Sequence, residues 1–95
     1  MKLQQLRYLV EVARRGLNVS EAAEALYTSQ PGISKQIRLL EEELGVAVFE
    51  RGGKRLTAIT EPGRAVLELA ERMLRDAENI RRVVEEYAGG DSGSL

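Results

Sequence analysis

Cysteine, histidine and tryptophan are all missing from the 95 residues of this sequence. Without cysteine there is no disulfide and no thiolate nucleophile, and without histidine the usual general base and the usual zinc ligands are missing as well. No stretch approaches the roughly 18 consecutive apolar residues of a membrane span, and the N-terminus lacks the apolar segment of a signal peptide. The sequence therefore predicts a soluble, cytoplasmic, non-enzymatic protein with no cofactor, no metal site and no membrane contact.

Aromatic residues are scarce, at 4%, and the charges nearly balance. Hydrophobic residues make up 43%, enough for one compact aliphatic core. The net charge is −1, but residues 1–60 carry nine Lys/Arg and seven Asp/Glu, a net of +2, whereas residues 61–95 carry five and eight, a net of −3. The positive excess lies in the N-terminal part, and non-specific attraction to phosphate should be modest.

A first helix is predicted over residues 3–15. Its apolar residues recur at helical spacing and are Leu3, Leu6, Leu9, Val10, Ala13 and Leu17. Gly16 follows as a stop signal after two arginines that suit a helix C-terminus. We expect this helix to bury Leu6, Leu9, Val10 and Ala13 against the two helices that follow.

Residues 18–38 contain two short amphipathic segments with a polar break between them. Asn18 is a suitable N-cap of the first, and Glu21 three residues later completes the pattern of a capping box. Small apolar residues then share one face, which lets a second helix cross closely: Ala22, Ala23 and Leu26. In the break, Thr28 or Ser29 can cap the next helix.

The second segment has a buried and a polar face. Pro31 fits only its first turn, and Gly45 is the expected C-cap. The apolar stripe at i, i+4, i+7 and i+11 is Ile33, Ile37, Leu40 and Leu44. The opposite face presents Gln30, Ser34, Lys35 and Arg38. This pattern is that of a helix-turn-helix whose second helix enters a DNA major groove, although two such helices also occur in helical domains that bind no nucleic acid.

Three consecutive glutamates, residues 41–43, lie in the second half of this helix. They could form an acidic patch for a partner, but a solvated helix face is the favoured interpretation. With no histidine, no cysteine and no phosphate-binding glycine loop beside them, they make no catalytic site.

Residues 46–60 change to a two-residue period, interrupted by Gly52-Gly53. Two β-prone runs around a Gly-Gly turn predict a hairpin. Arg51, Lys54 and Arg55 cluster at its tip, which is typical of a wing that reaches phosphate or the minor groove beside a recognition helix. The alternative is a solvated turn whose charges prevent edge pairing.

A long last helix is predicted to follow Thr60 as its cap, with Glu61 and Pro62 in its first turn. An a/d seam runs along it and consists of Val66, Ala70, Met73, Ala77, Ile80, Val84 and Tyr87. A helix of roughly 27 residues is about 40 Å long, more than a small core can cover. The seam therefore predicts a dimer, while its first turns rest on the core. The Gly/Ser-rich residues 89–95 are interpreted as a flexible hinge to a further domain.

With these elements in place, the sequence resembles the LysR-type bacterial transcriptional regulators. The matching positions are Ala22-Ala23-Glu24, Leu26, Ser29-Gln30-Pro31-Gly32-Ile33-Ser34, Gln36-Ile37, Leu40-Glu41, Leu44-Gly45, Val48-Phe49-Glu50-Arg51, Leu56-Thr57 and Gly63. Within that family, residues 1–8 and 26–36 look most like the CysB/Cbl-type regulators of sulfur assimilation and cysteine biosynthesis.

The resemblance implies a mainly α fold: a winged helix-turn-helix over residues 1–60 (motif 18–38, wing 46–60), a linker and dimerisation helix over 61–88, and a hinge over 89–95. It implies a homodimer that binds double-stranded DNA, tetramers at full length, and a C-terminal domain that binds a small-molecule inducer. The residues expected to contact DNA are Thr28, Ser29, Gln30, Pro31, Ser34, Lys35, Arg38, Arg51, Lys54 and Arg55. The competing hypothesis is a helical protein-interaction module in which the helix-turn-helix is only structural.

Overall fold

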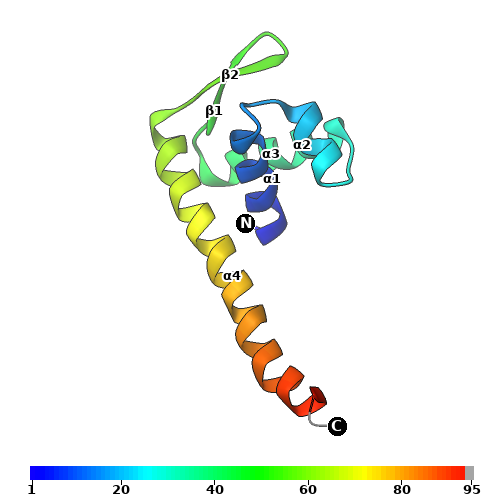
Figure 1. Ribbon diagram of the computed structural model, residues 1–95. Helices are drawn as coiled ribbons and strands as arrows, with labels where there is room; N and C mark the ends of the chain where they lie inside the picture. The colour runs from blue at the N-terminus through cyan, green and yellow to red at the C-terminus, as the bar shows by residue number, and fades with distance from the viewer. Residues whose placement is uncertain (94–95) are drawn as a thin grey trace.

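The computed structural model describes the backbone of residues 1–93 and the side chains of residues 1–88. Its elements are α1 (Leu3–Arg14), α2 (Val19–Ala25), α3 (Gln30–Leu44), β1 (Phe49–Gly52), β2 (Arg55–Ile59) and α4 (Glu61–Gly93). The first three helices form a compact head, the hairpin projects from one end of it, and α4 runs away in the opposite direction (Figure 1). The predicted mainly helical fold with a small hairpin is confirmed.

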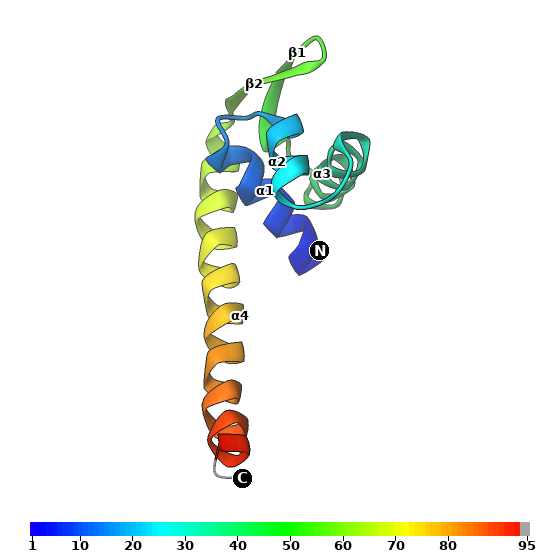
Figure 2. The same cartoon turned by 45° about the vertical axis from the view of Figure 1, so that its right-hand side comes forward.

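Helix α1 is the centre of the head, since it packs against α2, α3 and α4. Figure 2 shows it between α4 on one side and α3 on the other. Because it is covered on two sides, its buried stripe is wider than predicted and includes Val12, while Ala13 is only half-buried and Leu3 is 40% exposed. The core that results contains Leu6, Leu9, Val10, Val12, Ala22, Ala23, Ile33, Ile37, Leu40, Val48, Phe49, Leu67 and Ala70.

The helix ends of the motif follow the predicted local signals. The Asn18 side chain accepts a hydrogen bond from the Glu21 backbone N–H at 2.9 Å, and Ser29, not Thr28, accepts one from Gly32 at 3.1 Å. Gly45 ends α3 with a left-handed φ of 77°, which glycine adopts without strain. One detail is wrong: the Glu21 carboxylate faces Arg15 at 3.5 Å, so the capping box has only one of its two bonds.

The hairpin is a two-stranded antiparallel sheet that pairs Phe49 with Ile59 and Gly52 with Arg55. Its turn is Gly53-Lys54, one residue later than the predicted Gly52-Gly53, and Gly53 takes the positive φ of 67°. The register shifts after Glu50, which leaves the opposite strand with one extra residue at Thr57. The predicted alternation fails at the start of the strand, where Val48 and Phe49 are both buried.

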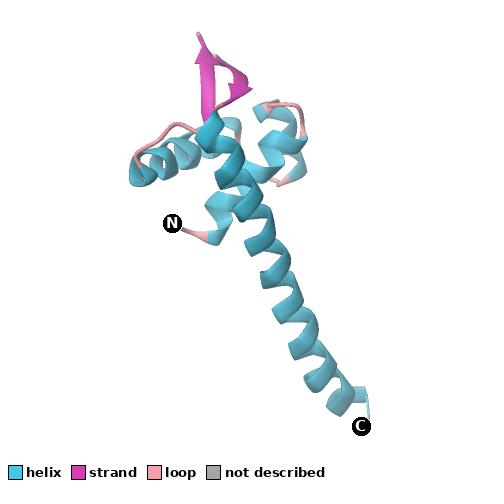
Figure 3. Cartoon of the chain, turned by 90° about the vertical axis from the view of Figure 1, so that its left-hand side faces the viewer, coloured by secondary structure: helices cyan, strands magenta, loops and turns pink. Residues whose placement is uncertain are grey.

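Helix α4 begins at the foot of the hairpin, as Figure 3 shows. The predicted cap is confirmed: Thr60 Oγ1 accepts a hydrogen bond from the Gly63 N–H at 2.9 Å and donates to the Ala47 carbonyl oxygen at 2.6 Å. The first turns rest on α1 and bury Leu67 and Ala70.

The far half of α4 extends beyond the head and is longer than predicted. The helix continues to Gly93, so residues 89–93, predicted as a hinge from their Gly/Ser-rich composition, are helical. Residues 94–95 of the predicted hinge lie outside the described part. No helix among the described residues is long and apolar enough to cross a membrane.

Candidate nucleic-acid interface

The front of α3 presents an exposed polar face above a buried stripe. Ile33, Ile37 and Leu40 are at most 1% exposed and fix the helix on α1 and α2. The predicted groove-facing residues lie on the opposite side and are exposed, except for half-buried Ser34; they are Gln30, Pro31, Ser34, Lys35 and Arg38. The helix-turn-helix therefore leaves this face free for a partner.

A groove separates α3 from the hairpin and continues to the start of α2. One part of it is lined by α3 and hairpin residues that include Gln30, Ser34, Arg38 and Lys54. The adjoining part has a volume of about 480 Å³ and adds the α1–α2 turn, Ser20 and Arg55. Gln30, Lys54, Val19 and Leu56 line both parts. We call this concave surface the α3–wing groove.

Most of the cations that border this groove are available for an anionic partner. Among the described residues, the groove-lining cations Arg38, Lys54 and Arg55 form no ion pair with an acidic side chain, and neither does Lys35, which lies beside Arg38 on α3 but outside the lining of the groove. Arg15, near the start of α2, differs: the hydrogen bond that it donates to the Glu11 carboxylate raises its pKa, and a second carboxylate, Glu21, also pairs with it. The cations without an acidic partner near this groove therefore lie on the front half of α3 and at the hairpin tip, where a phosphate backbone could contact both.

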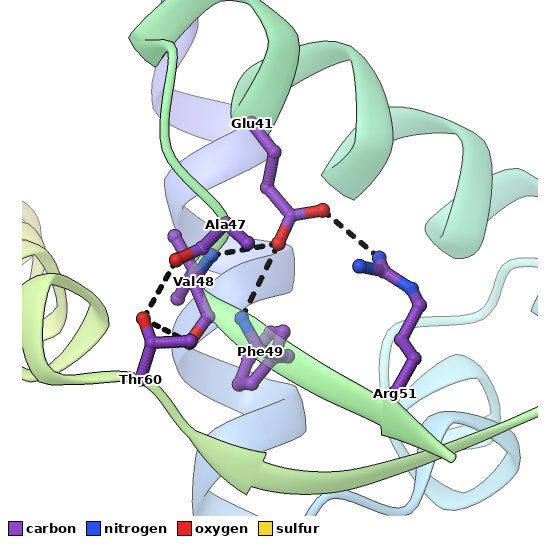
Figure 4. A network of polar contacts seen from close by, with 6 residues as sticks. All are labelled: Glu41, Ala47, Val48, Phe49, Arg51 and Thr60. Carbon is purple, nitrogen blue, oxygen red and sulfur yellow. Dashed lines mark hydrogen bonds and ion pairs between the residues drawn. The ribbon is translucent and has the colours of Figure 1, made fainter.

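Glu41 joins α3 to the hairpin, as Figure 4 shows. Its Oε2 accepts hydrogen bonds from the backbone N–H groups of Val48 at 2.7 Å and Phe49 at 3.2 Å. Its Oε1 lies 2.9 Å from Arg51 Nη2 in an ion pair. Glu41 is only 8% exposed, so the interpretation of residues 41–43 as a solvated face is wrong for this glutamate. The carboxylate thus accepts the hydrogen bonds of two buried backbone N–H groups that do not donate to the neighbouring strand.

The three cations of the predicted hairpin tip are therefore not equivalent. Arg51 lies on β1 and its charge is balanced by Glu41, with 29% of its side chain exposed. Lys54 lies in the turn and Arg55 opens β2, both exposed. Lys54 and Arg55 are therefore the two cations of the hairpin that a partner can reach without breaking an ion pair, whereas Arg51 is bound to Glu41.

Two residues that hold this surface in place were missed from the sequence. Glu41 did carry a signal, because it follows Ile33 and Ile37 at four-residue spacing on the buried stripe. Ser20 carried none: its hydroxyl donates to Gln30 Oε1 at 2.9 Å across the turn of the motif. Thr28 and Ser29, predicted to contact DNA, lie in the turn before α3, where Ser29 already serves as the N-cap. Among the described residues, no cluster of acidic side chains is placed to hold a metal ion.

Comparison with known proteins assigns the chain to a family. The family described as bacterial regulatory helix-turn-helix protein, lysR family, matches residues 3–64. The HTH-type transcriptional regulator SsuR of Burkholderia cenocepacia is 59% identical over all 95 residues, and CysB of Haemophilus influenzae is 54% identical; the chain spans 31% and 29% of their lengths. The Escherichia coli regulator cbl is 48% identical over the same residues.

Solved structures that resemble this chain include domains in complex with DNA. The CbnR DNA-binding domain–DNA complex has a TM-score of 0.82 at 38% identity, covering 93% of this chain and 99% of that one. The complex of the BenM DNA-binding domain with catB site 1 DNA has a TM-score of 0.85 at 33% identity, covering 93% and 96%. The relatives are transcriptional regulators and not enzymes, and the predicted resemblance to CysB/Cbl-type regulators is confirmed. This chain belongs to the LysR family of bacterial regulatory helix-turn-helix proteins and is a DNA-binding domain of that family.

Proposed function

We propose that this chain recognises a specific double-stranded DNA sequence as a homodimer, with α3 in the major groove and the hairpin on the flanking backbone or minor groove. The α3–wing groove carries this proposal. It brings base-reading side chains from α3 and unbalanced cations from the hairpin to one concave surface. A net charge of −1 supplies little general attraction to DNA, so affinity must come from this local surface and from pairing of two chains.

The residues of α3 divide by the chemistry they offer. Gln30 and Ser34 can hydrogen-bond base edges, and the apolar ring of Pro31 can meet a thymine methyl group. Lys35 and Arg38 can contact guanine or phosphate. Thr28 and Ser29, at the front of the helix, can contact the DNA backbone near its N-terminus.

The dimer contact is proposed on the far half of α4. Met73, Ile80, Val84 and Tyr87 of the predicted seam are 42–77% exposed in the single chain, and Val83 beside them is 50% exposed. Ala70 is 1% exposed and Val66 is half-buried, so the first part of the predicted seam packs against the head of the same chain. The proposed interface is therefore shorter than the sequence predicted and begins near Met73. A second copy of α4, packed antiparallel, would cover it.

The wider role follows from the same relatives. The chain spans about three tenths of their length. We propose that a C-terminal domain binding a small-molecule inducer follows in the whole protein, that the full-length protein forms tetramers in the cytoplasm, and that its targets are genes of sulfur assimilation and cysteine biosynthesis. Identities of 59%, 54% and 48% to SsuR, CysB and cbl support this choice of subfamily.

The proposed function is tested by fluorescence anisotropy on a palindromic LysR-family-like duplex and a scrambled control. We expect at least roughly 100-fold tighter binding to the palindrome, because each mismatched base pair costs about 1–3 kcal/mol and the scrambled duplex contains several, with two chains per duplex on the palindrome. Val84→Asp should abolish cooperative binding of the second chain, since it places a charge in the proposed seam. Asn79→Asp adds the same charge at an exposed position outside the seam and should bind like the wild type.

Equal, weak binding to both duplexes would contradict sequence-specific recognition by this chain. It would favour the competing hypothesis, in which the exposed face of α4 is the working surface and the helix-turn-helix is structural. Unchanged cooperativity in Val84→Asp would contradict only the dimer contact.

The ion pair at the base of the hairpin predicts unequal salt effects. Lys54→Ala is expected to lower the magnitude of the slope of log K against log salt by about one, the value for one phosphate contact. Arg51→Ala should change the slope much less. Because Glu41 already balances the charge of Arg51, this arginine neutralises little phosphate charge and releases few counterions from the DNA. The measurement is a salt titration of each variant on one duplex, with Arg14→Ala, at the end of α1 and outside the lining of the groove, as the control. Equal slopes for Arg51→Ala and Lys54→Ala would mean that Arg51 leaves Glu41 when DNA binds.

A further inference from the structure

One hydrogen bond joins the two helices of the motif at the surface that would face a base. The Ser20 hydroxyl, in the first turn of α2, donates to Gln30 Oε1 at 2.9 Å, and Gln30 is the first residue of α3. Both side chains are exposed, and both line the α3–wing groove. The bond spans ten residues, so it is not part of either helix or of either N-cap.

The bond restricts what the Gln30 amide can offer. A glutamine side chain carries one carbonyl oxygen, which accepts, and one NH₂ group, which donates twice. The preferred contact of glutamine with adenine uses both ends at once, since the oxygen accepts from N6 and the nitrogen donates to N7. With the oxygen directed at Ser20, the trigonal geometry of the amide turns the NH₂ group away from α2. Gln30 then directs its two N–H donors at a ligand in the groove, while Ser20 occupies one of the two lone pairs of the amide oxygen and fixes the orientation of the amide.

We propose that Ser20 is a positioning residue that sets the base preference of Gln30. Held by Ser20, Gln30 favours a base that shows acceptors in the major groove, guanine through O6 and N7 or thymine through O4, over the two-ended contact with adenine. This inference rests on the proposed function, because it assumes that α3 enters the major groove. The proposal places one residue that influences base preference, Ser20, on α2, although only α3 is proposed to contact the bases.

The decisive experiment is selection from a randomised duplex pool by the whole chain, followed by affinity measurements on duplexes that differ at the one base pair that responds to Gln30→Ala. The wild type should prefer guanine or thymine there. Ser20→Ala should shift the ratio of affinities toward adenine by roughly fivefold, the effect of one hydrogen bond in such a pair. Alanine is the better helix former, so the variant keeps α2. Ser20→Thr retains the hydroxyl and should keep the wild-type preference.

A double-mutant cycle separates positioning from a structural role. In the Gln30→Ala background, Ser20→Ala should leave base preference unchanged, because there is no amide left to orient. A merely structural serine would lower affinity for all duplexes alike and move no preference. The inference is overturned if Ser20→Ala selects the same base as the wild type, or if the wild type prefers bases that present a donor. If the wild type shows no preference at any base pair, the proposed function fails together with it.

Discussion

Replacing Glu41 with alanine is expected to lower the free energy of unfolding by about 3 kcal/mol. The change removes the acceptor of the Val48 and Phe49 N–H groups, and both residues are at most 1% exposed. A buried donor without a partner costs about 1–3 kcal/mol. Loss of the ion pair with Arg51 adds little, because the guanidinium is partly exposed and water replaces the carboxylate. Urea denaturation followed by circular dichroism at a fixed protein concentration measures the effect.

Two variants show which part of Glu41 matters. Glu41→Gln keeps an oxygen that can accept from the two N–H groups and should recover most of the stability, although it breaks the ion pair. Glu42→Ala, at the exposed neighbour, should stay within about 0.5 kcal/mol of the wild type. A loss of stability in Glu41→Gln as large as in Glu41→Ala would place the effect in the charge and not in the N–H bonds.

Gly63→Ala should be at least as damaging, although alanine favours helices. A Cβ at this position would lie 2.2 Å from the Val48 carbonyl oxygen and 3.0 Å from its carbon, and these are backbone atoms that cannot rotate away. The foot of the hairpin would have to move off α4, which breaks the hydrogen bond from Thr60 N to the Val48 oxygen at 2.9 Å. Overpacking costs about 1–3 kcal/mol and the lost bond about 1 kcal/mol more. The expected loss is about 3 kcal/mol.

Arg64→Ala is the matched control for Gly63→Ala. It introduces the same residue at the next position of the same helix turn, where the side chain is exposed. Its unfolding midpoint should not fall, whereas that of Gly63→Ala should drop sharply in the same denaturation series. A Gly63→Ala variant with wild-type stability would show that the hairpin and α4 can separate without loss.

The predictions that succeeded depend on contacts between residues close together in the sequence. Asn18, Ser29, Gly45 and Thr60 each act on a backbone group within four residues, so their spacing alone identifies the helix ends. The buried stripe of α3 is likewise a property of helical period. These features place the polar face of α3, which is the greater part of the candidate interface.

The failures arose where a second element decides the outcome. Glu41 is buried because the hairpin supplies two N–H groups and Arg51 seven to ten residues later. Ala70 belongs to the core, because α1 covers the start of α4, so the proposed dimer contact has to begin further along the helix. The turn is Gly53-Lys54 and not the predicted Gly52-Gly53. The pairing between the two strands, with its extra residue at Thr57, sets the register and therefore the position of the turn. The spacing of residues along the sequence does not show which of these elements pack against each other.

The junction between the head and α4 converts small angles into long displacements. Thr60 bonds the Val48 backbone at the foot of the hairpin and also starts α4, while Leu67 and Ala70 hold the first turns of α4 on α1. The head therefore sets the direction in which the rest of the helix points. A helix of 33 residues is about 50 Å long, so a rotation of only about 5° at the head displaces the far end by about 4 Å. In the proposed dimer, a small change of angle at this junction would therefore shift the partner chain by several times the displacement that it causes within the head.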